Sequence, residues 1–349
     1  MRILVIRRDN IGDLVCTTPL LAALRERYPA AHIAALVNSY NAAVLDGNPH
    51  VDEVHRYTKL KHRSPGESAA AIVLARLKMM ARLRQHTFDY IILAKAGFDR
   101  HGLGIARRLK RRHIVGFEPA GKDVQAITLK VPGEPDPAHH EVQVMQDLGR
   151  AVDVPRADGP LRVYPDPSRT EAWRTRLARS AFRKRPVWIA IHVSARESSR
   201  QLPPERWVEL IRRLSASGEA GVVLLWSPGA AADSRHPGDD EKAAAILAAL
   251  KDEEAIMPAP TSGLADLIAV LSLCNAFIGS DGGAMHLAAA VGLPIVAVFE
   301  NLESKKKRWY PWQARHELVS PATGDVADMS IDQVVQAWQR LASRGLRPR

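Results

Sequence analysis

The chain has 349 residues, 46% of them hydrophobic, which is enough for two domains that each bury a core of their own. Its only cysteines, Cys16 and Cys274, lie in apolar segments without metal-ligand spacing, which argues for a reducing compartment and excludes a disulfide scaffold or a Cys-based zinc site. No apolar run approaches the roughly 20 residues of a membrane span. A strand pattern begins at Arg2 with no signal-peptide architecture, so we expect a cytoplasmic protein.

The net charge of +11 is unevenly placed along the chain. Residues 56–112 hold fifteen Lys and Arg against three acidic residues. Such a surface favours anionic partners such as phospholipid headgroups, a phosphorylated glycolipid or nucleic acid, although a merely solubilising surface has the same composition. Nucleic acid is the weaker candidate, because few aromatic residues interleave the charges and no RNA-binding motif is present.

The first half of the chain alternates strand and helix patterns. Near-continuous apolar strands separated by helices indicate a parallel sheet covered on both faces. We expect strands at 2–7, 32–37, 51–56, 88–94 and 112–117, and helices near 18–28, 40–46, 67–86, 100–110 and 139–153.

The second half repeats this alternation after a proline-rich segment. We therefore expect an α/β protein of two Rossmann-like, doubly wound domains that face a central cleft, where ligands of this class bind. The predicted boundaries are a first domain at 1–160, a linker at 161–186 and a second domain at 187–349, whose last helix could pack back on the first domain. Strands are expected at 187–193, 221–226, 255–258, 276–279 and 295–299, and helices at 204–216, 239–251, 263–273, 284–291 and 330–344.

The first strand ends in a polar turn that contains Asp9, Gly12 and Asp13. It lacks the G-x-G-x-x-G pattern of a dinucleotide site and offers a carboxylate beside a flexible glycine. Asp13 or Thr18 could instead cap the following helix, with Pro19 in its first turn. The residue pattern alone leaves both interpretations open.

The first turn of the second domain carries hydroxyl and guanidinium groups ahead of a helix that starts with proline. Ser194 and Arg200 suit an anionic ligand, although an ordinary surface loop has the same residue types. Arg200 and the turn Asp281–Gly283 follow different strands of one sheet, so we expect them to meet.

A Gly-rich turn, Ser280–Gly283, joins an apolar strand to a helix of small residues that ends at Gly292. Its two glycines permit close backbone approach, and the helix N-terminus favours a phosphate. His286, in the first helical turn, faces that site or packs beneath it. A tight connection without a ligand is the simpler interpretation.

Three segments together resemble the ADP-heptose:lipopolysaccharide heptosyltransferases, glycosyltransferase family 9. The first is the opening strand with Gly12-Asp13 and Pro19, and the second is Ser194…Arg200…Pro203 with Trp207. The third is similar to the nucleotide-sugar signature of the family and reads Gly279-Ser-Asp281-Gly-Gly-Ala-Met-His286-Leu-Ala-Ala-Ala-Val-Gly292-x-Pro294. They come in the family's order and span residues 1–300.

The resemblance implies the GT-B fold and an inverting, metal-independent glycosyltransferase without a cofactor. It implies an acceptor-binding first domain with Asp13 as the base, Asp9 being the nearest rival, and a nucleotide-sugar-binding second domain. The donor, ADP-heptose or a related nucleotide sugar, would be held by Ser194, Arg200, Asp281, Gly282, Gly283, His286 and Glu241. On the acceptor side we expect Arg8, Gly12, Lys61 and Arg63. The expected partners are an anionic, lipid-linked core oligosaccharide and the cytoplasmic face of the inner membrane, to which the protein would bind peripherally.

The sequence departs from the family pattern at several positions. Arg200 stands where lysine is usual, Gln201-Leu202 replaces the expected x-Trp, and Ala94-Lys95-Ala96-Gly97 does not match the acceptor-side Gln-Gly element. The acceptor, and to a lesser degree the sugar, therefore stay open. The alternatives are a nucleotide-sugar 2-epimerase of the same two-domain architecture and a non-catalytic nucleotide-sugar binder.

Overall fold

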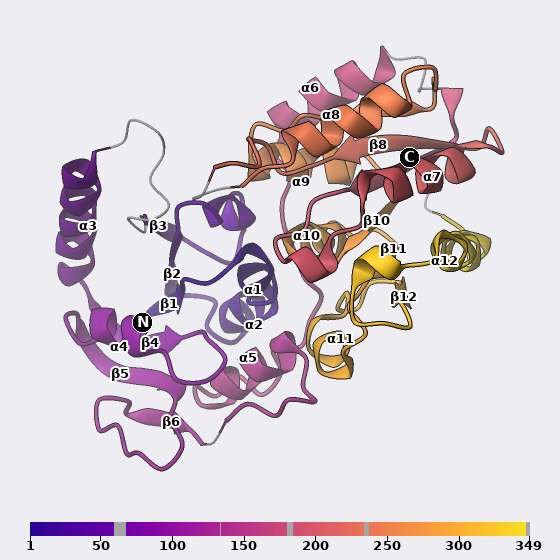
Figure 1. Cartoon of the computed structure of the whole chain (residues 1–349). Helices are drawn as coiled ribbons and strands as arrows, with labels where there is room; N and C mark the ends of the chain where they lie inside the picture. Colours follow the sequence, from indigo (N-terminus) through magenta and orange to yellow (C-terminus); the bar gives the residue numbers. More distant parts are fainter. Residues whose placement is uncertain (59–67, 133, 180–183, 234–236, 347–349) are drawn as a thin grey trace. The chain divides into compact units, whose positions relative to one another are not determined.

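The computed structural model describes residues 1–58, 68–132, 134–179, 184–233 and 237–346. The chain divides into two compact units, Met1–Val163 and Tyr164–Arg349 (Figure 1). Each unit holds a six-stranded sheet whose neighbouring strands all run parallel, which confirms the predicted fold class. Within the described ranges no helix has the length and apolarity needed to cross a membrane.

The sheet of the first unit has the strand order β3-β2-β1-β4-β5-β6. Its central strand β1 buries Ile3, Leu4, Val5 and Ile6 almost completely, as expected of a strand covered on both faces. The strands are β1 (Arg2–Arg7), β2 (His32–Asn38), β3 (Glu53–Tyr57), β4 (Thr87–Leu93), β5 (Lys110–Phe117) and β6 (Leu129–Val131).

The helices of the first unit are α1 (Ile11–Val15), α2 (Thr18–Arg27), α3 (Ala69–Arg84), α4 (Arg100–Ala106) and α5 (Glu141–Arg150). Two predicted helices need correction. The segment 40–46 forms only a short 3₁₀ turn, η1 (Ala42–Leu45), and the helix expected to run to residue 110 ends at Ala106 because Lys110 already starts β5. Helix α1 and strand β6 were not predicted, because they are too short to show a clear apolar periodicity.

The sheet of the second unit has the order β12-β11-β10-β7-β8-β9. Its strands are β7 (Val187–His192), β8 (Ala220–Leu225), β9 (Ile256–Pro258), β10 (Ala276–Ser280), β11 (Ile295–Val298) and β12 (His316–Val319). Counted from its own first strand, each sheet has the order 3-2-1-4-5-6 of the classic dinucleotide-binding fold. The order reverses between β1 and β4 in one unit and between β7 and β10 in the other, so the carboxyl ends of these strands are the expected ligand edge.

The helices of the second unit are α6 (Pro167–Ala178), α7 (Pro204–Ser215), α8 (Asp240–Ala249), α9 (Leu264–Ser272), α10 (Gly283–Ala290), α11 (Glu303–Trp309) and α12 (Ile331–Ser343), with short 3₁₀ turns η4 (Ser198–Arg200) and η5 (Val326–Asp328). The segment 161–186 contains α6, which packs on α9 and pairs Arg169 with Asp266 at 2.6 Å. Helix α12 packs on β11, β12 and α7 of its own unit. The sequence analysis did not identify α11 and β12.

Candidate active site

A buried arginine organises the turn that follows β1. The guanidinium Nη2 of Arg7 lies 2.6 Å from Asp13 Oδ1 and 2.7 Å from Glu141 Oε1, and Nη1 donates to the carbonyl of Ala94 at the end of β4. Arg7 and Glu141 are each 1% exposed, whereas the side chain of Asp13 is 16% exposed. Of these three side chains, only Asp13 therefore reaches solvent, and the buried Arg7 fixes its carboxylate in place.

The charges of this cluster are unbalanced. Burial alone would lower the pKa of Arg7, but the carboxylates of Glu141, Asp13 and Asp9 outweigh it and raise that pKa above its ordinary value. Asp9 lies farther away, with its Oδ2 3.7 Å from Arg7 Nε. Burial raises the pKa of Asp9, and the attraction of Arg7 only partly offsets this. The guanidinium of Arg7 thus faces three carboxylates, two of which, Asp9 and Asp13, are partly exposed.

Side chains at the end of β2 and directly after it fix the backbone of the same turn. The carbonyl oxygen of Asp9 accepts hydrogen bonds from Asn38 Nδ2 at 3.0 Å, Tyr40 Oη at 2.9 Å and Asn41 Nδ2 at 3.1 Å. The turn is consequently rigid, which is what a positioned catalytic group requires.

The predicted residues of this turn have different environments. Asp13 also accepts from the backbone N–H of Asn10 at 3.0 Å, so the helix-capping contact that the sequence left open is present alongside the ion pair. Gly12 is buried inside α1 and belongs to a regular helix, not to the flexible turn we expected. Arg8 stacks its guanidinium over the ring of Tyr57 at 4.7 Å. Lys61 and Arg63 lie outside the described residues.

A second arginine-centred cluster lies at the carboxyl edge of the other sheet. Arg200 follows β7, and its Nη1 is 3.1 Å from Oδ2 of Asp281, which follows β10. The Nε of Arg200 lies 3.0 Å from Glu300 Oε2, at the end of β11. Ser280 Oγ donates to the carbonyl of Arg200 at 2.8 Å. The neighbouring strands β7, β10 and β11 therefore bring these groups together, including the predicted pair Arg200 and Asp281.

Glu300 connects two cations. Its carboxylate accepts from Ser199 Oγ at 2.5 Å, from Arg200, and from the ammonium of Lys305 in α11. Burial raises the pKa of Glu300, but hydrogen bonds from Lys305, Ser199 and Arg200 outweigh it and lower that pKa to about 2. Burial raises the pKa of Asp281 to about 6, against the attraction of Arg200 and Lys305. The two carboxylates that pair with Arg200 thus have pKa values shifted in opposite directions.

The Gly-rich turn leaves open space beside this cluster. Gly282 has a φ of 168°, extended backbone that any residue adopts, and beyond the adjacent residues an added Cβ would meet its nearest atom, the carbonyl oxygen of Ser280, at 3.9 Å. The protein fold itself therefore does not require a glycine here, and the missing side chain keeps the N-terminus of α10 open. His286 is 2% exposed and packs edge-on against Trp309 of α11, with ring centroids 5.8 Å apart. It supports the α10–α11 contact from beneath.

The remaining predicted donor residues lie along the same edge but bind the protein backbone. Ser194 Oγ accepts from the N–H of Ser227 at 2.8 Å, and Glu241 Oε2 accepts from the N–H of Ala231 at 3.1 Å. Both contacts fasten the loop between β8 and α8. Burial lowers the pKa of His192, at the end of β7, to about 4, so this imidazole is neutral at physiological pH.

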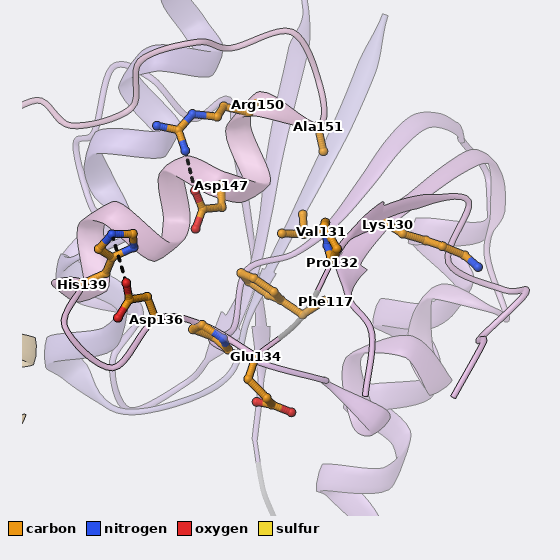
Figure 2. A pocket seen from close by; sticks show the side chains of 11 residues that line it. Phe117, Lys130, Val131, Pro132, Glu134, Asp136, His139, Asp147, Arg150 and Ala151 are labelled. Carbon is orange, nitrogen blue, oxygen red and sulfur yellow. Dashed lines mark hydrogen bonds and ion pairs between the residues drawn. The ribbon is translucent and has the colours of Figure 1, made fainter. Parts of the chain in front are cut away.

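The first unit contains a cavity of about 540 Å³, and Figure 2 shows the side chains that line it. It lies between the ends of β5 and β6 and helix α5, and ion pairs form within its lining, Asp136 with His139 at 3.7 Å and Asp147 with Arg150 at 2.6 Å. Its wall includes neither Asp9 nor Asp13. The cavity is therefore separate from the carboxylate cluster of Arg7.

Three residues of these clusters were not predicted from the sequence. Glu141 and Glu300 meet Arg7 and Arg200 only after folding, over separations of 134 and 100 residues, and Lys305 joins the second cluster through Glu300. The only local signal was an acidic residue directly after an apolar strand, as at Glu300. In the part of the chain that the structure describes, no group of three His, Cys, Asp or Glu residues could hold a metal ion.

Comparisons with known proteins identify relatives of the chain and of its fold. Lipopolysaccharide heptosyltransferase 2 of Salmonella typhimurium is 25% identical over 310 residues, covering 86% of this chain and 82% of the relative. A provisionally named glycosyltransferase of Haemophilus influenzae is 24% identical over 347 residues, covering 95% and 93%. The solved structure of Escherichia coli heptosyltransferase WaaC with ADP has a TM-score of 0.75 at 16% identity, over 98% of this chain and 100% of that one. At this identity the structural likeness concerns the fold.

A family model described as glycosyltransferase family 9 (heptosyltransferase) matches residues 76–339, which is most of the chain. The match includes the Arg200 cluster and the Gly-rich turn. The chain therefore belongs to glycosyltransferase family 9, the heptosyltransferase family, and is a glycosyltransferase.

Proposed function

We propose that the protein transfers heptose, or a related sugar, from an ADP-sugar to a lipopolysaccharide core oligosaccharide, with inversion at the anomeric carbon and without a metal ion. The relatives named lipopolysaccharide heptosyltransferase support the substrate classes. The observation that carries the proposal is the Arg200 cluster beside the open Gly282 turn.

The second unit supplies the donor site in this proposal. Arg200 and Lys305, together with the N-terminal amides of α10, neutralise the diphosphate of the donor. Glu300 holds both cations in place. As the bond between the anomeric carbon and the diphosphate oxygen breaks, its electron pair goes to the leaving ADP, whose charge these groups stabilise. Ser194, Glu241 and His286 lie at or beneath the same edge and are proposed to shape the donor site.

The first unit supplies the base. An acceptor hydroxyl is a poor nucleophile, and it passes its proton to a carboxylate as its oxygen bonds to the anomeric carbon. Asp13 is our choice because Arg7 and the Asn10 amide fix its orientation while part of it stays exposed. Asp9 is the rival, favoured by its raised pKa. Arg8 and Gly12 flank the turn on the proposed acceptor side.

The acceptor is anionic and lipid-linked in this proposal, so the protein works at the cytoplasmic face of the inner membrane. The basic stretch 56–112 supports this assignment through its charge.

The test is a transfer assay with purified protein, ADP-heptose and deacylated core oligosaccharides, read by mass spectrometry. Product should gain one heptose, and turnover should persist in excess EDTA because protein groups neutralise the diphosphate. Loss of turnover in EDTA, restored by magnesium or manganese, would contradict the metal-independent mechanism. Donor alone should at most hydrolyse slowly, whereas epimerisation of the sugar would identify an isomerase instead.

A further inference from the structure

Helix α3 leaves most of its surface unpacked. The side that contacts the protein is a narrow stripe with Ile72, Met79 and Leu83, which are 1%, 8% and 0% exposed. Arg76 lies on this packed side, where its Nε donates to the carbonyl of Thr58 at 2.9 Å. The helix packs on the β3 side of its sheet (Figure 1).

The opposite side of α3 is apolar and exposed. Val73, Leu74 and Leu77 are 46%, 52% and 62% exposed, which makes them three of the five large exposed hydrophobic residues within the described ranges. At about 100° per residue they fall with the exposed Ala70 and Ala81 on one continuous arc. We call this arc, made of Ala70, Val73, Leu74, Leu77 and Ala81, the α3 apolar face. The exposed hydrophobic residues of α3 are thus gathered on one side of the helix.

Cations border the α3 apolar face. Lys78 and Arg82 are exposed along one flank, and Arg84 lies at the C-terminal end, where its Nε donates to the carbonyl of Arg108 at 3.1 Å. Residues 68–112, all of them described, contain eleven Lys and Arg against two acidic residues. One of the two, Asp99, is buried and caps α4, and the other, Asp89, pairs with Arg112. The border of the α3 apolar face thus carries Lys78, Arg82 and Arg84, within a stretch of chain that has a large basic excess.

An apolar face with a cationic border favours one kind of binding partner. A partner must offer negative charge at the border and an apolar phase at the centre, which the interface of an anionic bilayer does. A nucleic acid lacks the apolar phase. A second copy placed on the same face would bring two cationic borders together, which is unfavourable. We propose that α3 docks on an anionic lipid bilayer, with its apolar face inserted among the headgroups and its basic residues at the phosphates.

Helix α3 has 16 residues and is about 24 Å long, so it would lie along the interface and not span the bilayer. The inference extends the proposed function, since it names the surface that brings the enzyme to a lipid-linked acceptor. Its test uses neither donor nor acceptor. If α3 does not bind vesicles, the protein can still transfer sugar to soluble oligosaccharides. If it transfers no sugar, α3 can still bind vesicles.

The experiment is co-sedimentation with vesicles of phosphatidylcholine, with and without phosphatidylglycerol, at low and high salt. The protein should bind only the anionic vesicles, and part of this binding should survive high salt because apolar insertion is not screened. Leu74→Gln/Leu77→Gln should lower the salt-resistant part about tenfold or more. Lys78→Gln/Arg82→Gln should weaken mainly the binding at low salt. The matched control is Leu302→Gln, at a 45% exposed leucine of the second unit, which should bind as the unmodified protein does.

A probe at the face gives a second readout that does not depend on affinity. Both native cysteines are buried, so Leu77→Cys can be labelled selectively with an environment-sensitive fluorophore. Its emission should shift to the blue on anionic vesicles, whereas the same label at Leu302→Cys should not respond. The proposal is overturned if the label at 77 stays in water on bound vesicles, or if the double glutamine variant binds as well as the unmodified protein. It is equally overturned if sedimentation shows a dimer, or a complex with an acidic protein, that depends on Leu74 and Leu77.

Discussion

The two units use the same device at the same place in the fold, with opposite chemical results. In each, an arginine at the carboxyl edge of a parallel sheet bridges two carboxylates, Asp13 and Glu141 for Arg7, and Asp281 and Glu300 for Arg200. Arg7 is 1% exposed and faces a third carboxylate, Asp9. Arg200 is 22% exposed and shares Glu300 with a second cation, Lys305.

Burial and the extra charge decide what each cluster can do. In the Arg7 cluster the arginine is buried and the carboxylate of Asp13 is partly exposed to solvent, which suits the removal of a proton from a substrate. In the Arg200 cluster the carboxylates are buried and the arginine is partly exposed beside the N-terminus of α10. This arrangement suits the binding of an anion. An arginine with two acidic partners is therefore not one kind of site. Its function depends on which partner is left accessible.

The largest effect that tests this contrast is expected for Asp13→Asn. The change keeps the size of the side chain and removes its basicity, so we expect kcat to fall about 10²-fold or more. Asp9→Asn is the matched variant four residues earlier and should act mildly, or through the acceptor KM. Steady-state kinetics with both variants decides between them. If Asp9→Asn is the inactive one, the carboxylate with the raised pKa is the base and the role of Asp13 is structural.

Removing the charge of Glu300 should reduce stability. Its pKa of about 2 in the folded protein is below the ordinary 4.5, so its ionisation contributes stability above about pH 4.5 that is lost as the pH falls towards 2. Glu300→Gln should therefore lower the free energy of unfolding at neutral pH by about 2–3 kcal/mol. Denaturant melts at several pH values measure this, and the difference should shrink in acid. A constant difference would mean that Glu300 acts through packing.

Asp281→Asn should have the opposite sign and a smaller effect. The pKa of Asp281, about 6, is above the ordinary 3.8, so the folded state loses stability as the pH rises through this range. The asparagine variant should gain about 2 kcal/mol at neutral pH and nothing near pH 4. The same melts serve as the measurement. A loss at neutral pH would show that the Arg200 ion pair outweighs the burial of the carboxylate.

The sequence was sufficient for five of the six strands in each sheet, because these are apolar runs such as Ile3–Ile6, but it did not reveal β6 and β12. It also placed Arg200 and Asp281 at one edge, since both follow strands of one parallel sheet. It missed α11, which buries none of its residues and so has no apolar period. Lys305 lies in α11 and was therefore not predicted either. Glu300 was not predicted because its role depends on Arg200, which follows β7, two strands away from β11 in the sheet. Local patterns show where a strand ends but not which ends become neighbours.

Titration calorimetry with ADP tests the division between the two clusters most directly. Compared with the unmodified protein, Asp13→Asn should bind ADP with an unchanged Kd. Arg200→Gln should bind about tenfold or more weakly, because a charged hydrogen-bond donor to phosphate is lost. Lys305→Gln serves as a second variant that leaves Arg200 paired, and it should weaken binding in the same direction. The account is contradicted if Asp13→Asn loses ADP affinity as Arg200→Gln does, or if both cation variants, still folded by their thermal melts, bind ADP as the unmodified protein does.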